Sequence, residues 1–243
     1  MKPVQYEVVY RTERDHWWYR VRRELAKKLI AICAGKGGGL HILDIGCGTG
    51  ALMTELASLG EVEGVDASEI AIEYCRSRGL TRVRVGSAEA LPYPEGTFDI
   101  VLALDVLEHV RDDRVAIAEI RRVLKQGGAA VIFVPAFRFL WGAIDELGEH
   151  FRRYTLRELR AKLAESGFGV RYSSYFNFFL FLPILFVRKL VRLFRTPSIS
   201  ENEIGSPIIN ALCYRVFSFE RALLPHVRFP FGVSVMAVCR KQQ

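Results

Sequence analysis

The chain has 243 residues, half of them hydrophobic, and a formal net charge of +7 at pH 7. This length suits one α/β domain with a sizeable core and a modest addition, and the hydrophobic content excludes disorder over most of the chain. The positive charge favours an anionic partner, either a nucleic acid or a membrane surface. Because no basic stretch is interleaved with aromatic residues, no nucleic acid is expected.

Five cysteines lie far apart, and none forms a C-x-x-C pair. This spacing indicates neither a disulfide framework nor a zinc site, so no metal is expected and the reducing cytoplasm is the expected compartment. The first ten residues mix polar and apolar side chains and lack the continuous apolar core of a signal peptide, so none is expected.

The first predicted helix opens at His16-Trp17-Trp18-Tyr19 and ends in the glycines of residues 35–39. Its apolar side chains recur at helical spacing, at Val21, Leu25, Leu29 and Ile32. Adjacent tryptophans cannot both face the core of one helix, so at least one of them covers a neighbouring element or lines a cleft.

The segment Leu43-Asp44-Ile45-Gly46-Cys47-Gly48-Thr49-Gly50 is typical of a buried strand that ends in a glycine-rich turn. An apolar helical pattern (Leu52, Leu56, Leu59) follows it. The glycines permit a tight turn and leave room for a nucleotide-like ligand. A second short strand, residues 61–65, leads to Asp66, whose carboxylate can accept hydrogen bonds from ribose hydroxyls. The pair predicts an adenosine-containing cofactor.

Two kinds of cofactor are compatible with the glycines alone. Gly46, Gly48 and Ala51 satisfy the dinucleotide fingerprint, which would suit a nicotinamide or a flavin. Asp44, however, stands at the same turn, where its carboxylate would repel a pyrophosphate and attract an ammonium group. S-adenosylmethionine carries an ammonium and no phosphate, so the electrostatics favour it.

The first motif, Asp44-Ile45-Gly46-Cys47-Gly48-Thr49-Gly50, resembles that of the class I S-adenosylmethionine-dependent methyltransferases. Later segments resemble further motifs of that family, in the family's order: residues 64–68, 86–93, 98–101 with 107–110, and 124–128. The resemblance therefore covers about residues 40–135. The resemblance implies S-adenosyl-L-methionine as cofactor, bound by Asp44, Gly46, Cys47, Gly48, Gly50, Asp66, Ala67, Ser87, Ala88 and Leu104.

One position departs from the family pattern. Ser87 stands where the family usually has an aspartate that accepts a hydrogen bond from the adenine amino group. A serine hydroxyl can also accept, but the contact is neutral and therefore weaker. The backbone amide of Ala88 would be unaffected, so a modest affinity for the same cofactor is expected.

Between residues 40 and 134, apolar runs alternate with helical patterns, which predicts right-handed β-α-β units and a doubly wound, mostly parallel sheet. The fifth, sixth and last strands are expected at residues 129–135, 168–172 and 232–239. In the resembled Rossmann-like fold the sheet has seven strands and the last one runs antiparallel. The expected organisation is an N-terminal helical lid (1–39) with Trp17 at the substrate, a methyltransferase core (40–172 and 232–243) and a helical insertion (173–231).

The insertion joins the sixth strand to an antiparallel seventh, so it lies at the sheet end where ligands bind. Residues 178–187 are ten consecutive apolar residues, too few to span a bilayer, which needs about 20. Basic residues follow at helical spacing: Arg188, Lys189, Arg192 and Arg195. The pattern favours an amphipathic helix on an anionic membrane surface, peripheral on the inner face of the membrane. A core helix, a homodimer contact and a true span stay open as alternatives.

Transfer of a methyl group to a hydroxyl requires removal of a proton, for which a histidine is the simplest base near neutral pH. His150 lies in a segment that follows the fifth strand and resembles a signature of a bacterial subset of this family, with an Arg-Arg-Tyr-Thr run. In one interpretation His150 is the base and Asp145 orients it, while His109 is a further catalytic candidate. Acceptor contacts are then expected from Trp141, Arg152, Arg153 and Tyr154.

The alternative interpretation of this segment is structural. Thr155 would cap a helix in capping-box spacing with Glu158, and the two arginines would only anchor the loop.

The expected function is O-methylation of a lipophilic or lipid-linked acceptor, because the insertion implies an apolar substrate or interface. The quinone-biosynthesis methyltransferases resemble the core, which makes a prenylated quinone precursor one candidate acceptor, and a glycolipid or polyprenyl-linked sugar another. Two alternatives stay open. One is a soluble small-molecule methyltransferase that uses the insertion as a lid or dimer contact. The other is a non-catalytic, cofactor-binding interaction protein.

Overall fold

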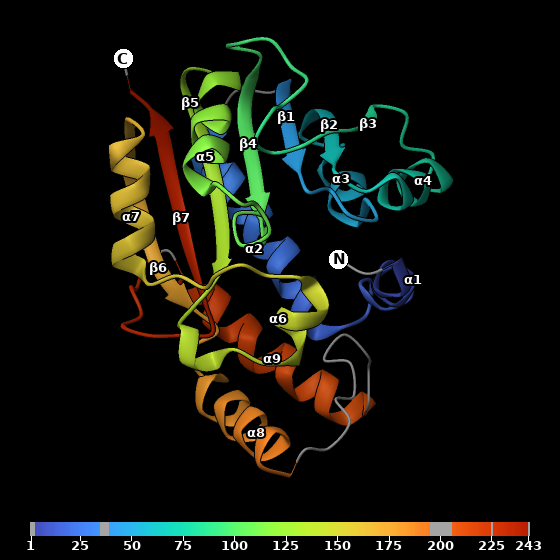
Figure 1. Ribbon diagram of the computed structural model, residues 1–243, viewed down its shortest axis with the longest axis vertical. Helices are drawn as coiled ribbons and strands as arrows, with labels where there is room; N and C mark the ends of the chain where they lie inside the picture. Colours follow the sequence, from blue (N-terminus) through green and yellow to red (C-terminus); the bar gives the residue numbers. More distant parts are fainter. Residues whose placement is uncertain (1–2, 35–38, 195–205, 225, 243) are drawn as a thin grey trace.

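The computed structural model describes residues 3–34, 39–194, 206–224 and 226–242 (Figure 1). Within them one sheet of seven strands has the order β3-β2-β1-β4-β5-β7-β6. Neighbours among β1 to β5 pair in parallel, whereas β7 is antiparallel to both β5 and β6. The predicted seven-stranded, mostly parallel sheet is therefore confirmed. The strands are β1 (Leu40–Ile45), β2 (Gly60–Asp66), β3 (Val83–Val85), β4 (Phe98–Leu104), β5 (Leu124–Pro135), β6 (Phe168–Phe176) and β7 (Ser234–Lys241).

Helices cover both faces of the sheet, which is why β4 and residues 129–135 of β5 are almost continuously apolar and buried. In Figure 1, α5 and α7 lie in front of the sheet and α2 lies behind it. The helices are α1 (Pro3–Thr12), α2 (Trp17–Ala34), α3 (Ala51–Leu56), α4 (Glu69–Ser77), α5 (Asp113–Val123), α6 (Ala143–Gly148), α7 (Leu156–Glu165), α8 (Phe181–Phe194) and α9 (Pro207–Leu223), with a short 3-10 helix at Arg138–Leu140.

The predicted helix over the tryptophans is confirmed as α2, and the predicted strands are confirmed with shifted ends. β6 runs on to Phe176 and β7 to Lys241, because these two strands pair with each other along their whole length. The helix α1 was not predicted, because its ten residues are only weakly amphipathic.

Both adjacent tryptophans are half-buried and pack on other elements. Trp18 is stacked with Phe176 at the end of β6 and with Phe217 of α9, at ring distances of 6.5 and 5.9 Å. Trp17 meets Phe217 edge-on at 5.9 Å. Both rings therefore join α2 to the segment between β6 and β7, which is the outcome in which tryptophans cover a neighbouring element.

Three helices gather at the sheet end where the parallel strands finish, namely α6, α8 and α9 (Figure 1). The buried Glu220 of α9 holds this region together, because its carboxylate accepts hydrogen bonds from the backbone N–H groups of Phe178 and Phe179 at 2.7 and 3.2 Å. Burial raises the pKa of Glu220 to about 7. Among the described residues, no helix combines the length and the apolar character needed to cross a membrane.

Candidate functional site

The glycine-rich turn after β1 is closed by hydrogen bonds from the N–H groups of Gly46 and Cys47 to the Val65 carbonyl, at 2.7 and 3.2 Å. Gly46 has a φ of +66°, and a Cβ there would stand 2.6 Å from Val106 Cγ2. Gly48 also has a positive φ, of +54°, but a Cβ there would meet no atom closer than 4.0 Å. Gly46 is thus required by close packing, whereas Gly48 opens onto free space in which a ligand can approach the backbone.

Asp44 is a buried carboxylate that lacks a partner. It is 3% exposed at the end of β1, and no hydrogen bond or ion pair reaches it from the described residues. Burial, and then the nearby charge of Asp66, raise the pKa of Asp44 to about 7. An unpaired buried carboxylate is costly, so the site suits a cationic group such as the ammonium of S-adenosylmethionine.

Asp66 ends β2 on the other side of the same turn. Its Oδ2 accepts a hydrogen bond from the Gly48 N–H at 3.0 Å, and its Oδ1 accepts one from the Ser68 N–H at 2.9 Å. Burial raises the pKa of Asp66, and these two bonds oppose the rise. The carboxylate of Asp66, which was predicted to bind a ribose, is thereby fixed at the edge of the glycine turn.

The remaining predicted cofactor residues lie in or beside the ends of β1 to β4. Cys47 is buried with its sulfur 3.9 Å from that of Cys75, and Ala67 is exposed beside Asp66. Ser87 Oγ accepts a hydrogen bond from the Glu89 N–H at 3.1 Å, so part of its acceptor capacity is used in a local turn. Ala88 is buried, and Leu104 is half-buried at the end of β4.

The helix α1 packs beside this cradle, within the segment that was expected to form an N-terminal lid. Its Tyr6 is buried, and the pKa of the phenol is raised first by burial and then by the charge of Asp66. The Tyr10 ring lies 4.6 Å from that of Tyr74 in α4. Figure 1 shows α1 alongside α4. The structure therefore brings an aromatic side chain of the N-terminal segment next to the predicted ribose partner.

Glu13 ties the end of α1 to the glycine turn. Its carboxylate is buried and accepts hydrogen bonds from the Thr49 hydroxyl and from the Arg78 guanidinium. Burial raises the pKa of Glu13 despite these contacts. Displacement of α1 would break both bonds and expose this carboxylate.

A second cluster is built on the loop that follows β5. His150 Nδ1 lies 2.8 Å from Asp145 Oδ1, and the Asp145 carboxylate is completely buried. The Arg153 guanidinium binds both oxygens of Asp145, at 2.7 and 2.8 Å. Burial alone would raise the pKa of Asp145, but the hydrogen bonds with His150 and Arg153 hold it well below its ordinary value. The predicted pairing of His150 with Asp145 is therefore present.

His109 stands beside this pair. Its ring is nearly perpendicular to that of His150, with the centroids 4.5 Å apart. Burial, and then His150, lower the pKa of His109 to about 3, so this ring is neutral at pH 7. The backbone of Gly148 acts on this pKa in the opposite direction.

The sequence did not single out Glu108, which is fully buried between the histidines and Asp105. Neither of its carboxylate oxygens has a hydrogen-bond partner among the described residues. Burial, followed by the charge of Asp105, raises the pKa of Glu108 well above its ordinary value. Asp105 itself has a φ of +58° and is paired with the buried Arg22. In the sequence, Glu108 could be noticed only as part of the run Leu107-Glu108-His109-Val110, in which His109 alone is a catalytic candidate.

Three of the predicted acceptor residues make contacts within the protein. Arg153 is buried against Asp145 and donates through Nη1 to the Ala136 carbonyl at 3.0 Å. The Tyr154 hydroxyl donates to Asp113 at 2.8 Å, and Arg152 also pairs with Asp113, at 3.2 Å. These contacts hold the loop in place. The Thr155–Glu158 capping box of the alternative interpretation is present.

The other predicted substrate and membrane residues differ in how far they are buried. Trp141 is half-buried just after the 3-10 helix, and Trp17 is used in packing. Arg188 donates through Nη1 to the Leu140 carbonyl at 2.8 Å, while Lys189 is exposed. Of the other two predicted membrane contacts, Arg195 and the side chain of Arg192 lie outside the described residues.

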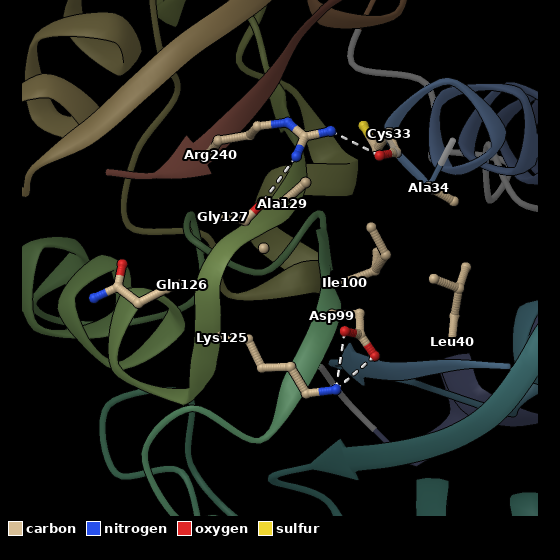
Figure 2. Close-up of a pocket in the computed structure, with 11 residues that line it drawn as sticks. Cys33, Ala34, Leu40, Asp99, Ile100, Lys125, Gln126, Gly127, Ala129 and Arg240 are labelled. Carbon is tan, nitrogen blue, oxygen red and sulfur yellow. Dashed lines mark hydrogen bonds and ion pairs between the residues drawn. The ribbon is translucent and has the colours of Figure 1, made fainter. Parts of the chain in front are cut away.

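The cavity in Figure 2 is not at the cofactor turn. Leu40 and Asp99 in its wall stand at the starts of β1 and β4, the sheet end opposite the glycines. Its charged side chains are already paired. Lys125 contacts Asp99 at 2.9 Å, and Arg240 donates to the carbonyls of Gly127 and Cys33 at 2.9 and 2.8 Å. We assign no ligand to it.

Comparison with known proteins is consistent with this geometry. Residues 43–132 match the family model described as a methyltransferase domain. A probable S-adenosylmethionine-dependent methyltransferase of Mycolicibacterium smegmatis is 29% identical over 160 residues, which are 64% of this chain and 61% of that protein. A ubiquinone biosynthesis O-methyltransferase of Mesorhizobium japonicum is 40% identical over 102 residues, 40% of each chain. The match therefore spans less than two thirds of these relatives.

A solved structure extends the likeness of the fold. It is that of Haemonchus contortus phosphoethanolamine N-methyltransferase 2 in complex with S-adenosyl-L-methionine, with a TM-score of 0.58 and 17% identity. The alignment covers 89% of this chain and 52% of that one. At this identity the likeness concerns the fold alone.

Proposed function

We propose, because the chain belongs to the class I S-adenosylmethionine-dependent methyltransferases, that it transfers the methyl group of this cofactor to a hydroxyl of a lipophilic acceptor at a membrane surface. The observation that carries the proposal is the meeting of two clusters at one end of the sheet. Val106 packs against Gly46 of the cofactor turn, and only two and three residues later the chain reaches Glu108 and His109.

The cofactor cradle would use four features of the turn. Asp44 would pair with the ammonium of S-adenosylmethionine, and Asp66 would accept hydrogen bonds from the ribose hydroxyls. Gly48 leaves room for the ligand at the backbone, and Ser87 with Ala88 would contact the adenine. When bound, the cofactor supplies an electrophilic methyl group on a sulfonium.

The acceptor end would be served by His150. Because Nδ1 faces Asp145, the proton on that nitrogen is held there and Nε2 is left to accept the proton of an acceptor hydroxyl. His109 is neutral at pH 7 and adds no positive charge that would oppose the transfer. The choice of oxygen as the methylated atom is supported by the named O-methyltransferases among the relatives.

The apolar acceptor and the membrane are inferred from the outer faces of α8 and α9. Large hydrophobic side chains are exposed there: Leu182 66%, Phe186 63%, Val187 56%, Ile208 81%, Ile209 62%, Leu212 59% and Phe219 59%. Phe179, which precedes α8, lies 5.8 Å from Phe219 of α9, which joins the two faces. A surface of this kind is unusual on a monomeric soluble protein and suits a lipid interface or a second subunit.

The parts of the chain receive roles on this basis. The core is formed by residues 40–172 and 232–243, and residues 173–231 form the substrate and membrane module. Within residues 1–39, α1 would act as the lid over the cofactor, whereas α2 supports the sheet and α9. A peripheral location on the inner face of a membrane is part of the same proposal.

The proposed reaction is tested with S-adenosylmethionine labelled in its methyl group, incubated with the protein and a whole-cell extract of its host. Label in the chloroform phase supports a lipophilic acceptor. Label only in the aqueous phase favours a soluble small-molecule methyltransferase with α8 and α9 as a lid or dimer contact. No label in either phase, despite measured cofactor binding, would contradict methyl transfer.

Membrane attachment is tested separately by co-sedimentation with vesicles of anionic phospholipid. The double variant Leu182→Ser/Phe186→Ser should lose most of its binding, because each exposed side chain contributes through the apolar area that it buries. Ile32→Ser is the matched control, since Ile32 is 56% exposed on α2. Equal sedimentation of all three proteins would exclude α8 as the membrane contact.

A further inference from the structure

The cluster of Glu108, His109 and His150 has the donor set of a metal site. One ligand atom from each residue lies within 4.8 Å of the others. Two imidazoles and one carboxylate form a set that divalent first-row transition ions accept, whereas magnesium and calcium prefer oxygen ligands. No metal was expected from the sequence, and that expectation rested on the spacing of the cysteines alone.

The Glu108 carboxylate is an independent indication of a ligand. It is 0% exposed, and both of its oxygens lack a hydrogen-bond partner among the described residues. Buried polar groups are nearly always satisfied, so two orphaned oxygens on one side chain require an explanation. A cation between Glu108 and the two histidines would satisfy them.

His150 is already oriented as metal ligands usually are. His150 keeps Nδ1 on Asp145 at 2.8 Å, and Asp145 is itself fixed by Arg153. The His109 ring lies against Gly148, where an added Cβ would stand 3.5 Å from its Cε1. A carboxylate or backbone group on the outer nitrogen fixes the tautomer and leaves the other nitrogen for the ion.

We propose that Glu108, His109 and His150 bind a divalent transition-metal ion that holds the acceptor hydroxyl. Three protein ligands leave at least one coordination position for an oxygen. The geometry supports binding of the ion by itself, whereas its part in catalysis rests on the proposed methyl transfer.

The acceptor hydroxyl coordinates to the ion and ionises, and its proton passes to water, because the charge of the cation lowers the pKa of a bound O–H group. The resulting oxygen anion attacks the methyl carbon. The C–O bond forms as the C–S bond breaks, and the electron pair of that bond goes to sulfur. The products are the methyl ether and S-adenosylhomocysteine. His150 then acts as a ligand and not as the base.

Binding is measured on the full chain after treatment with a chelator and dialysis, by calorimetry and by the visible absorption of Co²⁺. We expect one Co²⁺ per chain, displaced by Zn²⁺ and not by Mg²⁺. The variants Glu108→Gln and His109→Asn should each lower the affinity more than tenfold, and Asp145→Asn should lower it about 10- to 100-fold. Absence of stoichiometric binding to the wild-type protein would overturn the site.

Two further variants distinguish specific loss of the ion from misfolding of the protein. Gly148→Ala keeps all three ligands, but its Cβ would stand 2.8 Å from His150 Nε2 and 3.5 Å from His109 Cε1. It should therefore bind Co²⁺ weakly while its thermal unfolding stays cooperative. His41→Asn is the control, because His41 forms a His–Glu pair with Glu63 at the opposite end of the sheet, at 3.0 Å. If His41→Asn lost the ion, or if Glu108→Gln kept it, the assignment would be wrong.

The catalytic part has its own readout. Methyl transfer should stop in the metal-free protein and return with Co²⁺ or Zn²⁺. Full activity after complete removal of the ion would overturn the catalytic role and leave His150 as the direct base. Binding of the ion without any methyl transfer would count against the proposed function and not against the site.

Discussion

Substitution of Asp44 by asparagine should weaken cofactor binding and at the same time stabilise the protein. Hydrogen bonds to charged groups contribute about 1.5–3 kcal/mol, which corresponds to a loss of affinity of about 10- to 150-fold at pH 8. The pKa of Asp44 lies near 7 because the group is buried and close to Asp66. The affinity of the wild-type protein for S-adenosylmethionine should therefore rise about tenfold between pH 6 and pH 8 as the carboxylate ionises, whereas that of Asp44→Asn should stay flat.

The stability of the ligand-free protein should change in the opposite direction. A carboxyl whose pKa is raised from 3.8 to about 7 on folding gives its full contribution below pH 3.8 and loses it as the pH rises through 7. By pH 8 the ionised, unpaired group costs at most about 4 kcal/mol, which asparagine does not incur.

Calorimetric titration with S-adenosylmethionine from pH 6 to pH 8, together with urea unfolding, measures both effects. Glu69→Gln is the matched control, because it removes one exposed acid beside the same site. An unchanged affinity in Asp44→Asn, or the same pH dependence as in the wild-type protein, would refute the pairing of Asp44 with the ammonium. A variant that binds weakly but unfolds at higher urea cannot have lost binding through misfolding.

Three further substitutions test the framework around the site. Arg153→Gln should lower the free energy of unfolding by about 3–5 kcal/mol, because it leaves the buried carboxylate of Asp145 without its cationic partner. A change in KM alone, with unaltered unfolding, would instead indicate that Arg153 binds the acceptor. Thr155→Ala should cost about 1 kcal/mol in the same unfolding assay, through loss of the cap of α7, and no loss would count against the capping box. The difference in unfolding free energy between Glu220→Gln and the wild-type protein should shift by about 3 kcal/mol in favour of the variant between pH 4.5 and pH 8. The reason is that the raised pKa of Glu220 makes the wild-type protein less stable as the pH rises through 7. Parallel curves of stability against pH would contradict the raised pKa.

The fold and the cofactor turn could be predicted because their determinants are local. Gly46, Gly48 and Asp66 are required by backbone geometry and by one ligand, so their spacing in the sequence carries the information. The parallel sheet follows from the alternation of apolar runs with helical patterns, and the antiparallel last strand from the resemblance.

The acceptor end could be predicted only in part, because it depends on contacts between distant segments. The pairing of His150 with Asp145 was visible within one loop, but the burial of Glu108 depends on how that loop folds over the end of β4. Arg153 could equally have faced a substrate or a carboxylate, and only the observed bidentate contact with Asp145 decides between them. Helix α1 was missed because its contact with α4 is made by two isolated tyrosines and not by a periodic apolar face.

Because α1 contacts the cofactor turn, exchange of the cofactor would require α1 to detach from that turn. A ten-residue helix is marginal by itself in water, so α1 persists through its tertiary contacts, among them the bonds of Glu13 with Thr49 and Arg78. Product release would then require these contacts to open, on the microsecond-to-second timescale of such events. Turnover would be limited by the detachment of one short helix, and the methyl-transfer step itself could be much faster than the rate that a steady-state assay records.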